Sequence, residues 1–352
     1  MTDNEEPMII AGTINELPFN KYKRWQWWFL VGLSIMFLIV GQSAAVILGR
    51  FYYDQGGNST WMATLVQTIA FPVLLIPLFT IPSSSSEVSA SYVPPSIKLI
   101  ALIYFVLGIM IAADNMMYSQ GLLYLSASTY ALICASQLAF NAIFSYFINS
   151  QKFTALIVKL DRDSDTPSGI PKGKYVVGFL CTLGASALYS LLLSLMQLTF
   201  EKVLKKETFS VVLEMQIYTS LVATCASTIG LFASGEWHSL HEEMKSFQKG
   251  EVAYLMTLVW TAIAWQVCSV GVVGLIFLVS SLYSNVISTV SLAITPIAAV
   301  IVFHDKMNGV KIISMLMALW GFASYIYQNY LDDLKARRAQ AGTSKPHNES
   351  PC

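Results

Sequence analysis

Long apolar runs recur along the whole chain, and they constrain its fold more than any other feature. A helix needs about 20 apolar residues to cross the hydrocarbon core of a bilayer. The predicted spans are Trp27–Leu48, Trp61–Ile81, Ile97–Met117, Leu125–Phe147, Tyr175–Phe200, Phe209–Phe232, Val252–Val273, Ser280–Val302 and Val310–Tyr330. Only 12% of the residues are charged, against about one quarter in soluble domains. We therefore expect an all-α, multi-span membrane protein with nine clear spans.

The interiors of these spans carry almost no charge. Apart from Lys98 and Lys311, each the second residue of its span, no Lys or Arg lies inside them. A cation deep in the membrane would usually mark an anionic substrate. Its absence argues against phosphate, nucleotide-sugar and carboxylate cargo, and a sugar or organic-anion carrier keeps little weight. Asp114 and Glu214 are the acids within the spans or at their edges. Either could take up a proton during transport, although we favour the alternative that each is solvated near an interface.

Basic residues set the expected orientation, because Lys and Arg concentrate in cytoplasmic segments. They cluster in the N-terminal tail, in the loop after Phe200 and in the C-terminal tail. The acidic loop between Ala233 and Glu251 should face away, as should the loop that carries the glycosylation sequon at Asn58. The zero net charge argues against nucleic acid as a partner.

These orientations conflict in the middle of the chain. Four spans return the chain to the cytoplasm at Asn149, yet Tyr175 must start on the opposite side. The segment between them has one short apolar run, Phe153–Val158, which cannot cross as a helix. The expected parts are a cytoplasmic tail (1–26), a first half of four spans (27–153), a polar linker in place of a fifth span (154–174), a second half of five spans (175–334) and a cytoplasmic tail (335–352).

An internal repeat relates the two halves. Gly121–Leu125 resembles Gly274–Leu278, and Ser128 and Tyr130 match Ser281 and Tyr283. Two halves of five spans each would be inverted relative to one another, as in many secondary transporters. The sequence therefore predicts two inverted repeats of a ten-helix fold, one span short in this chain.

Polar stripes within the spans mark a candidate cavity. In the fourth span, Tyr130, Cys134, Gln137 and Asn141 fall on one helical face. The equivalent stripe of the eighth span includes Ser288 and Ser291. Aromatic rings and amides suit a planar heteroaromatic ligand, while ordinary interhelical hydrogen bonding is the alternative. If the stripe binds solute, Gln137→Ala or Asn141→Ala should reduce uptake more than membrane expression.

Further candidates are polar or aromatic residues elsewhere in the spans: Gln67, Asn115, Trp265 and Gln266. Pro72, Pro77 and Pro296 should kink their helices next to something other than plain lipid. A small-residue seam of Gly41, Ala45 and Gly49 would let another helix approach closely, unless it arises by chance. No phosphate loop, nucleophile elbow or metal-ligand spacing is present, so we predict no enzyme activity, no metal and no cofactor.

Nine short motifs spread over nearly the whole chain are shared with a known family: Gly56–Trp61, Thr64–Thr68, Ser128–Tyr130, Gln137–Ala142, Asn149–Phe153, Gly230–Trp237, Phe303–Met307, Trp320–Phe322 and Tyr330–Asp333. In these motifs the chain resembles the plant purine permeases of the drug/metabolite transporter superfamily. The resemblance implies ten helices in two inverted halves and proton-coupled uptake of purine bases and related compounds such as cytokinins. It implies a multi-pass protein of a membrane, the plasma membrane by preference, whose partners are a neutral purine-type solute, protons and the lipid bilayer. Oligomeric state is left open.

The sequence departs from that family where the orientation argument failed. Family members continue after the Asn149–Phe153 motif into a fifth span, whereas here Leu156–Lys159 passes directly into Asp161. An alternative function is therefore a transport-incompetent variant that acts as a membrane partner of full-length relatives.

Overall fold

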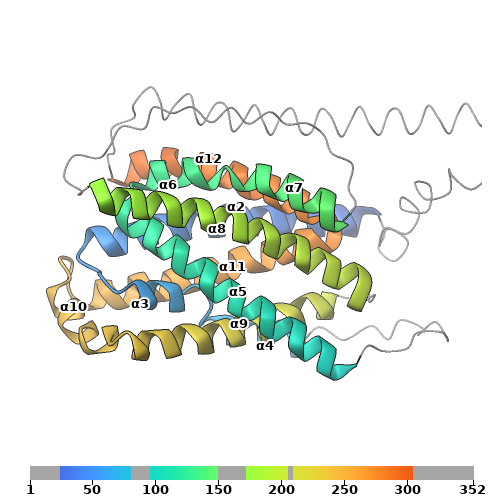
Figure 1. Ribbon diagram of the computed structural model, residues 1–352, viewed down its shortest axis with the longest axis horizontal. Helices are drawn as coiled ribbons and strands as arrows, with labels where there is room; N and C mark the ends of the chain where they lie inside the picture. Colours follow the sequence, from blue (N-terminus) through green and yellow to red (C-terminus); the bar gives the residue numbers. More distant parts are fainter. Residues whose placement is uncertain (1–23, 81–95, 150–171, 205–208, 304–352) are drawn as a thin grey trace, which may run out of the picture.

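The computed structural model describes residues 24–80, 96–149, 172–204 and 209–303, and the regular structure in these ranges is helical. The long helices lie side by side as a bundle (Figure 1). They are α2 (Arg24–Asp54), α5 (Ile97–Tyr124), α8 (Lys172–Leu198), α9 (Phe209–Ala233), α11 (Glu251–Leu278) and α12 (Ser281–Phe303). A π-helical turn, Thr199–Leu204, extends α8. By length and composition, five segments can cross a membrane: Trp25–Asp54, Ile97–Tyr124, Gly173–Leu204, Ser210–Ala233 and Glu251–Leu278.

These five segments coincide with the first, third, fifth, sixth and seventh predicted spans. Helix α12 occupies the eighth, while the ninth, Val310–Tyr330, lies outside the described residues. The count of nine spans and the inverted repeat therefore stay predictions.

The second and fourth predicted spans are both interrupted, whereas we expected a kink at Pro72 and Pro77 in the second and no break in the fourth. The second forms α3 (Thr60–Leu65), a 3₁₀ helix (Phe71–Leu74) and α4 (Leu75–Thr80). Pro72 is the second residue of the 3₁₀ helix, and a proline has no N–H for the α-helical ladder. The fourth forms α6 (Ala127–Cys134) and α7 (Gln137–Asn149), with a turn between them.

The first span is longer than predicted, and this corrects the expectation that it carries no basic residue. Helix α2 continues past Leu48 to Asp54 and so contains Arg50. Arg50 forms an ion pair with Asp54 one turn later, with 2.6 Å between Nη2 and Oδ1. Its Nη1 also donates to the carbonyl oxygens of Leu122 and Leu125 at the end of α5, each at 3.0 Å. Arg50 is thus held by the protein at the end of a span.

Helices α2 and α11 pack closely at Gly41, which confirms the predicted small-residue seam at that position, whereas Gly49 faces the Leu122 side chain of α5. A Cβ atom on Gly41 would lie 2.6 Å from the backbone nitrogen of Cys268. From the other side, a Cβ atom on Gly271 would lie 2.6 Å from the backbone nitrogen of Leu38. Glycine on both helices therefore permits their backbones to approach.

The bundle has two distinct ends. We call the one that carries the short helices η4 (Glu236–His238) and α10 (Leu240–Ser246) the loop end, which lies at the left in Figure 1. There Gln248 N donates to Gln55 O over 3.0 Å, so the two loops predicted to face away from the cytoplasm lie together. At the opposite end, the far end, Trp27 shares an apolar cluster with Leu204. The relative placement predicted from the basic residues is confirmed for these segments.

Helices α7 and α8 run parallel although they follow one another among the described helices. Ser190 Oγ donates to Gln137 O at 2.7 Å, and one turn later Ser194 Oγ donates to Asn141 Oδ1 at 3.3 Å. When two consecutive helices are parallel, the chain must return from the end of the first helix to the opposite end of the bundle before the second begins. The conflict predicted between Asn149 and Tyr175 is therefore present in the bundle: α7 ends at the far end and α8 begins at the loop end (Figure 1).

The repeated motif forms the same local structure twice. Gly121–Leu125 closes α5 and Gly274–Leu278 closes α11. After each, a serine caps the next helix: Ser126 Oγ accepts from Thr129 N at 3.4 Å, and Ser280 Oγ accepts from Tyr283 N at 3.1 Å. The first junction lies at the loop end and the second at the far end, which is the relation that two inverted halves would produce.

Candidate solute-binding site

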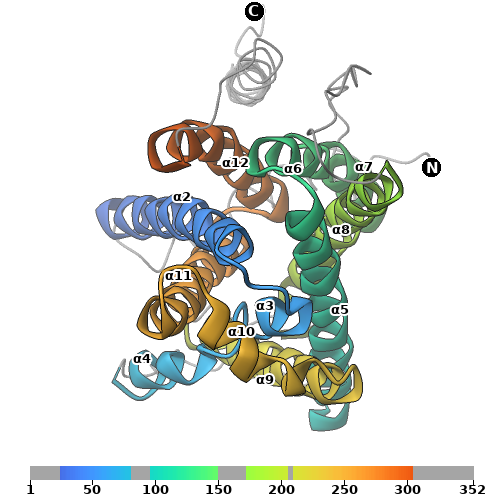
Figure 2. The ribbon, with the colours of Figure 1, turned by 90° about the vertical axis from the view of Figure 1, so that its left-hand side faces the viewer.

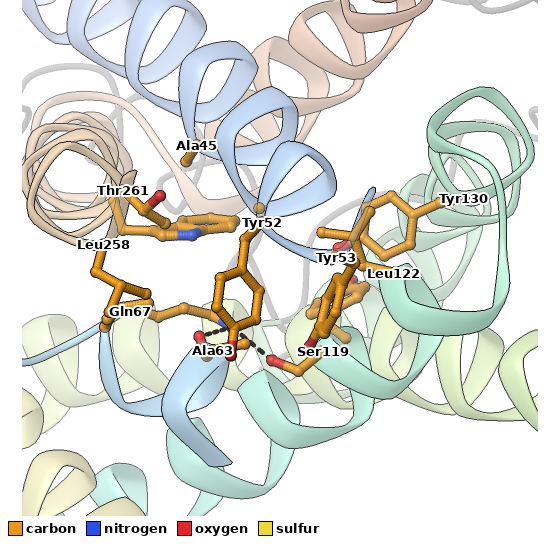
Figure 3. Close-up of a pocket in the computed structure, with 14 residues that line it drawn as sticks. Ala45, Tyr52, Tyr53, Ala63, Gln67, Ser119, Leu122, Tyr130, Leu258 and Thr261 are labelled. Carbon is orange, nitrogen blue, oxygen red and sulfur yellow. Dashed lines mark hydrogen bonds between the residues drawn. The ribbon is translucent and has the colours of Figure 1, made fainter. Parts of the chain in front are cut away.

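A cavity lies in the loop-end half of the bundle, where α2, α3, α5, α6 and α11 meet. Figure 2 looks along the bundle from the loop end and shows α3 between α11 and α5. The side chains around the cavity are drawn in Figure 3. They are Ala45, Gly49, Tyr52, Tyr53, Ala63, Val66, Gln67, Tyr118, Ser119, Leu122, Tyr130, Leu258, Thr261 and Trp265. The volume is about 30 Å³, room for about two water molecules. The cavity is therefore too small for a solute larger than a few water molecules, and such a solute requires the walls to move apart.

Aromatic rings form much of the wall. Tyr52 and Tyr53 come from the last turn of α2, and their rings meet edge to face at 5.1 Å. Tyr118 of α5 meets Tyr130 of α6 edge to face at 5.8 Å, and Trp265 of α11 completes the wall. Rings of this kind bind a flat aromatic solute through stacked or edge-on contacts.

The interrupted second span places an amide in the cavity. Gln67 follows the end of α3, and its Nε2 donates to Ser119 Oγ at 3.0 Å and to Ala63 O at 3.3 Å (Figure 3). A weaker contact of 3.4 Å reaches the backbone carbonyl of Asn115, whose half-buried side chain does not line the cavity. An amide both donates and accepts hydrogen bonds, so Gln67 can match a polar ring edge.

Asp114 is buried one turn before Tyr118 on α5, so these two residues share a helical face. Its side chain is 3% exposed, and within the described ranges its Oδ1 has no hydrogen-bond partner. The favoured expectation of a solvated acid is therefore wrong for Asp114, because α5 packs this position inside the bundle. Glu214, by contrast, is exposed on α9.

The predicted polar stripe divides at the break between α6 and α7. Tyr130 lines the cavity, and Tyr118 Oη donates to Gln137 Oε1 behind it at 3.4 Å. Gln137 Nε2 in turn donates to Ser288 Oγ at 3.0 Å. Asn141 lies farther along α7, where its Nδ2 donates to Ser281 O at 3.2 Å.

The eighth-span stripe also makes contacts between helices. Ser288 Oγ donates to Gln42 Oε1 at 3.0 Å, and Ser291 Oγ donates to Ile39 O at 3.1 Å. Gln266 is buried on α11 away from the cavity lining, and its Nε2 has no hydrogen-bond partner in the described part of the chain. The structure thus brings Gln67, Tyr130 and Trp265 to the cavity, with Gln137 behind it.

Sequence reasoning missed the aromatic pair Tyr52 and Tyr53. Both lie beyond the predicted end of the first span at Leu48, which was placed by apolar length alone. The run Phe51–Tyr53 before a glycine turn was the available signal, since α2 ends at Asp54 and Gly56 then turns the chain at φ +106°.

Comparison with known proteins decides the family. The family description "purine nucleobase transmembrane transport" matches residues 29–335. The chain belongs to the purine permease family. "Probable purine permease 11" of Arabidopsis thaliana is 64% identical over 365 residues, covering 99% of this chain and 96% of that protein. "Probable purine permease 13" and "Purine permease 21" of the same plant are 59% and 49% identical, covering 96% and 99% of this chain and 98% and 92% of those proteins.

Membership of the purine permeases fixes the broad class of the chain. It is an integral membrane protein of a transporter family, and its relatives are named permeases. The alignment with probable purine permease 11 runs over 365 positions, more than the 352 residues of this chain. That permease therefore has residues without a counterpart here.

Proposed function

We propose that this protein moves purine nucleobases and related neutral heteroaromatic compounds such as cytokinins across the plasma membrane. Transport proceeds by alternating access, with protons moving in the same cycle. The observation that carries the proposal is the loop-end cavity, whose wall combines Tyr52, Tyr53, Tyr118, Tyr130 and Trp265 with the amide of Gln67.

The chemistry of this wall suits a purine base. Aromatic side chains stack on the flat ring, and one amide offers a donor and an acceptor to the polar ring edge. Among the described residues, none that lines the cavity is Lys or Arg, so a neutral solute is favoured over an anion. Sites at interrupted helices are typical of secondary transporters, and Gln67 lies in such an interruption, between Leu65 and Phe71.

Asp114 is the proposed proton carrier. A charged carboxylate buried in a span costs free energy, so burial favours the protonated, neutral form of Asp114. Its position one turn from Tyr118 places it behind the cavity wall. Glu214, exposed on α9, is the weaker candidate.

The segment 154–174 remains the proposed site of a missing fifth span. A lost span accounts for the parallel packing of α7 on α8 and for the additional residues of probable purine permease 11.

The test is uptake of radiolabelled adenine by cells that express the chain, beside a version with an apolar helix of about 20 residues inserted after Val158. We expect saturable uptake of labelled adenine, and we expect unlabelled adenine or a cytokinin to reduce it. In Asp114→Asn, uptake should no longer depend on the proton gradient. Absence of adenine uptake by both versions, when each is present in the membrane, would contradict the proposal.

A further inference from the structure

Glu243 of α10 is a buried carboxylate that links three parts of the loop end. Its side chain is 5% exposed. One oxygen, Oε1, accepts hydrogen bonds from the hydroxyl of Tyr52 and, at 3.1 Å, from the hydroxyl of Tyr254. The other, Oε2, accepts from the backbone nitrogen of Ser59 at 3.0 Å. A carboxylate in such surroundings is stable only with several donors, and here three are supplied.

A second carboxylate, Glu236, holds the short helix α3, whose N-cap residue is Ser59. It accepts from Ser59 Oγ at 2.6 Å, from Thr60 Oγ1 at 3.2 Å and from the backbone nitrogen of Trp61 at 3.0 Å. Negative groups are favourable at the first turn of a helix because its N–H groups are unpaired there. The first turn of α3 is therefore held by two side chains from the segment between α9 and α11.

Both ends of this linkage reach the cavity. Tyr52 is part of its wall, and α3 carries Ala63 and leads to Gln67. A helix of six residues is too short to be stable alone, so its position depends on what anchors it. Movement of Glu243 would release a ring of the wall and, at the same time, one of the two anchors of the helix beside it.

We propose that Glu243 is a positioning residue for the solute site and, together with Glu236, a latch that closes the loop end over it. The proposal rests on the function proposed above, since it assigns these residues to the same site. In the latched state, the carboxylates hold α3 and Tyr52 against the cavity. Release of the latch opens the loop end and lets solute exchange.

Glu243→Gln tests the latch with little change in shape. A glutamine keeps one acceptor oxygen but replaces the other with a donor, so it cannot serve both the tyrosine hydroxyls and Ser59 N. Glu242→Gln is the matched control, because Glu242 is the neighbouring residue on α10 and is exposed. Each of these two variants is combined with Thr261→Cys, which places a thiol in the cavity wall. The same variant without Thr261→Cys measures the labelling of the chain's own cysteines.

The first readout is the rate at which a hydrophilic maleimide labels Cys at position 261 in purified protein. We expect Glu243→Gln to raise this rate about tenfold, the effect of one lost hydrogen bond to a charged group, while Glu242→Gln leaves it unchanged. The second readout is adenine uptake, in which Glu243→Gln should raise KM about tenfold and change Vmax less than about threefold. A merely structural residue would lower Vmax with the amount of protein and leave KM unchanged.

Equal labelling of Glu243→Gln and Glu242→Gln would overturn the latch. If Glu243→Gln does not reach the membrane, Tyr254→Phe removes a single donor from the carboxylate, and an unchanged labelling rate there would overturn it equally. The labelling does not depend on transport, so the two proposals can fail separately. If the chain takes up no adenine but Glu243→Gln still raises the labelling rate, the proposed function is contradicted and the latch is retained.

Discussion

The loop-end and far-end halves of the bundle differ in what their buried polar groups do. In the loop-end half, Gln67 and five aromatic rings surround a cavity. In the far-end half, polar side chains bond directly from helix to helix, as Asn141 does to Ser281 O and to Ser194. Gln137 lies at the boundary, with Tyr118 on one side and Ser288 on the other.

This difference indicates which end of the transporter is closed by packing. A site that alternates between two sides must break contacts at one end in each half of its cycle. At the far end these contacts are hydrogen bonds between α7, α8 and α12; for example, Ser281 N donates to Gln197 Oε1 at 3.0 Å. At the loop end they are the bonds of Glu236 and Glu243 to α3. The far end is thus held by direct contacts between helices, and the loop end by two carboxylates beside a small cavity.

The largest effect is expected where α2 crosses α11, because both halves depend on this contact. Gly41→Ala places a Cβ atom 2.6 Å from the Cys268 nitrogen and should cost about 1–3 kcal/mol. We expect a fall in unfolding temperature of about 5 °C in detergent and loss of most uptake. Gly32→Ala on the same helix meets nothing within 4 Å and is the control. Equal behaviour of the two variants would mean that close approach of the helices is not needed.

A large effect on solute affinity is expected from the cavity wall. Trp265→Ala removes a ring from it and should raise the KM for adenine about tenfold or more, since stacking on a base contributes about 1–3 kcal/mol. Trp260→Ala is the matched control, because Trp260 lies on the same helix and is 57% exposed. Uptake kinetics corrected for the amount of protein in the membrane measure both. The same KM for the two variants would place the solute elsewhere.

A smaller effect, of a different kind, is expected at the far end. Asn141→Ala removes two hydrogen bonds between helices, each contributing about 0.6 kcal/mol in a membrane protein. The unfolding temperature should fall by about 2–4 °C, while the KM for adenine stays within about twofold of wild type. A raised KM without a change in unfolding temperature would mean that Asn141 contacts the solute. The far-end half would then also bind solute, and the contrast between the two halves would be lost.

Much of the helical arrangement could be predicted from the sequence, because apolar length and glycine spacing act locally. The five long helices and the seam at Gly41 follow from these signals. The end of α2 could not be placed, since Arg50 and Tyr52 look like the edge of a span until their partners on other helices are known. The interruption between Cys134 and Gln137 had no proline or glycine to mark it.

The candidate site was predicted only in part. Tyr130 and Asn141 share a face on an uninterrupted helix, but the break in the fourth span separates their surroundings. Whether a buried amide faces a cavity or a neighbouring helix depends on packing between distant segments, which periodicity does not contain. Of the residues predicted from the stripe only Tyr130 lines the cavity, and it is joined there by Gln67 and Trp265, the weaker candidates by sequence.

Equilibrium binding of radiolabelled adenine to the purified protein tests the central claim most directly. We predict saturable binding by the wild type, about tenfold weaker binding by Gln67→Ala, which loses a polar partner for the solute, and unchanged binding by Asn141→Ala. Equal affinity for Gln67→Ala and the wild type, or weaker binding by Asn141→Ala alone, would contradict the assignment of the loop-end cavity as the purine site.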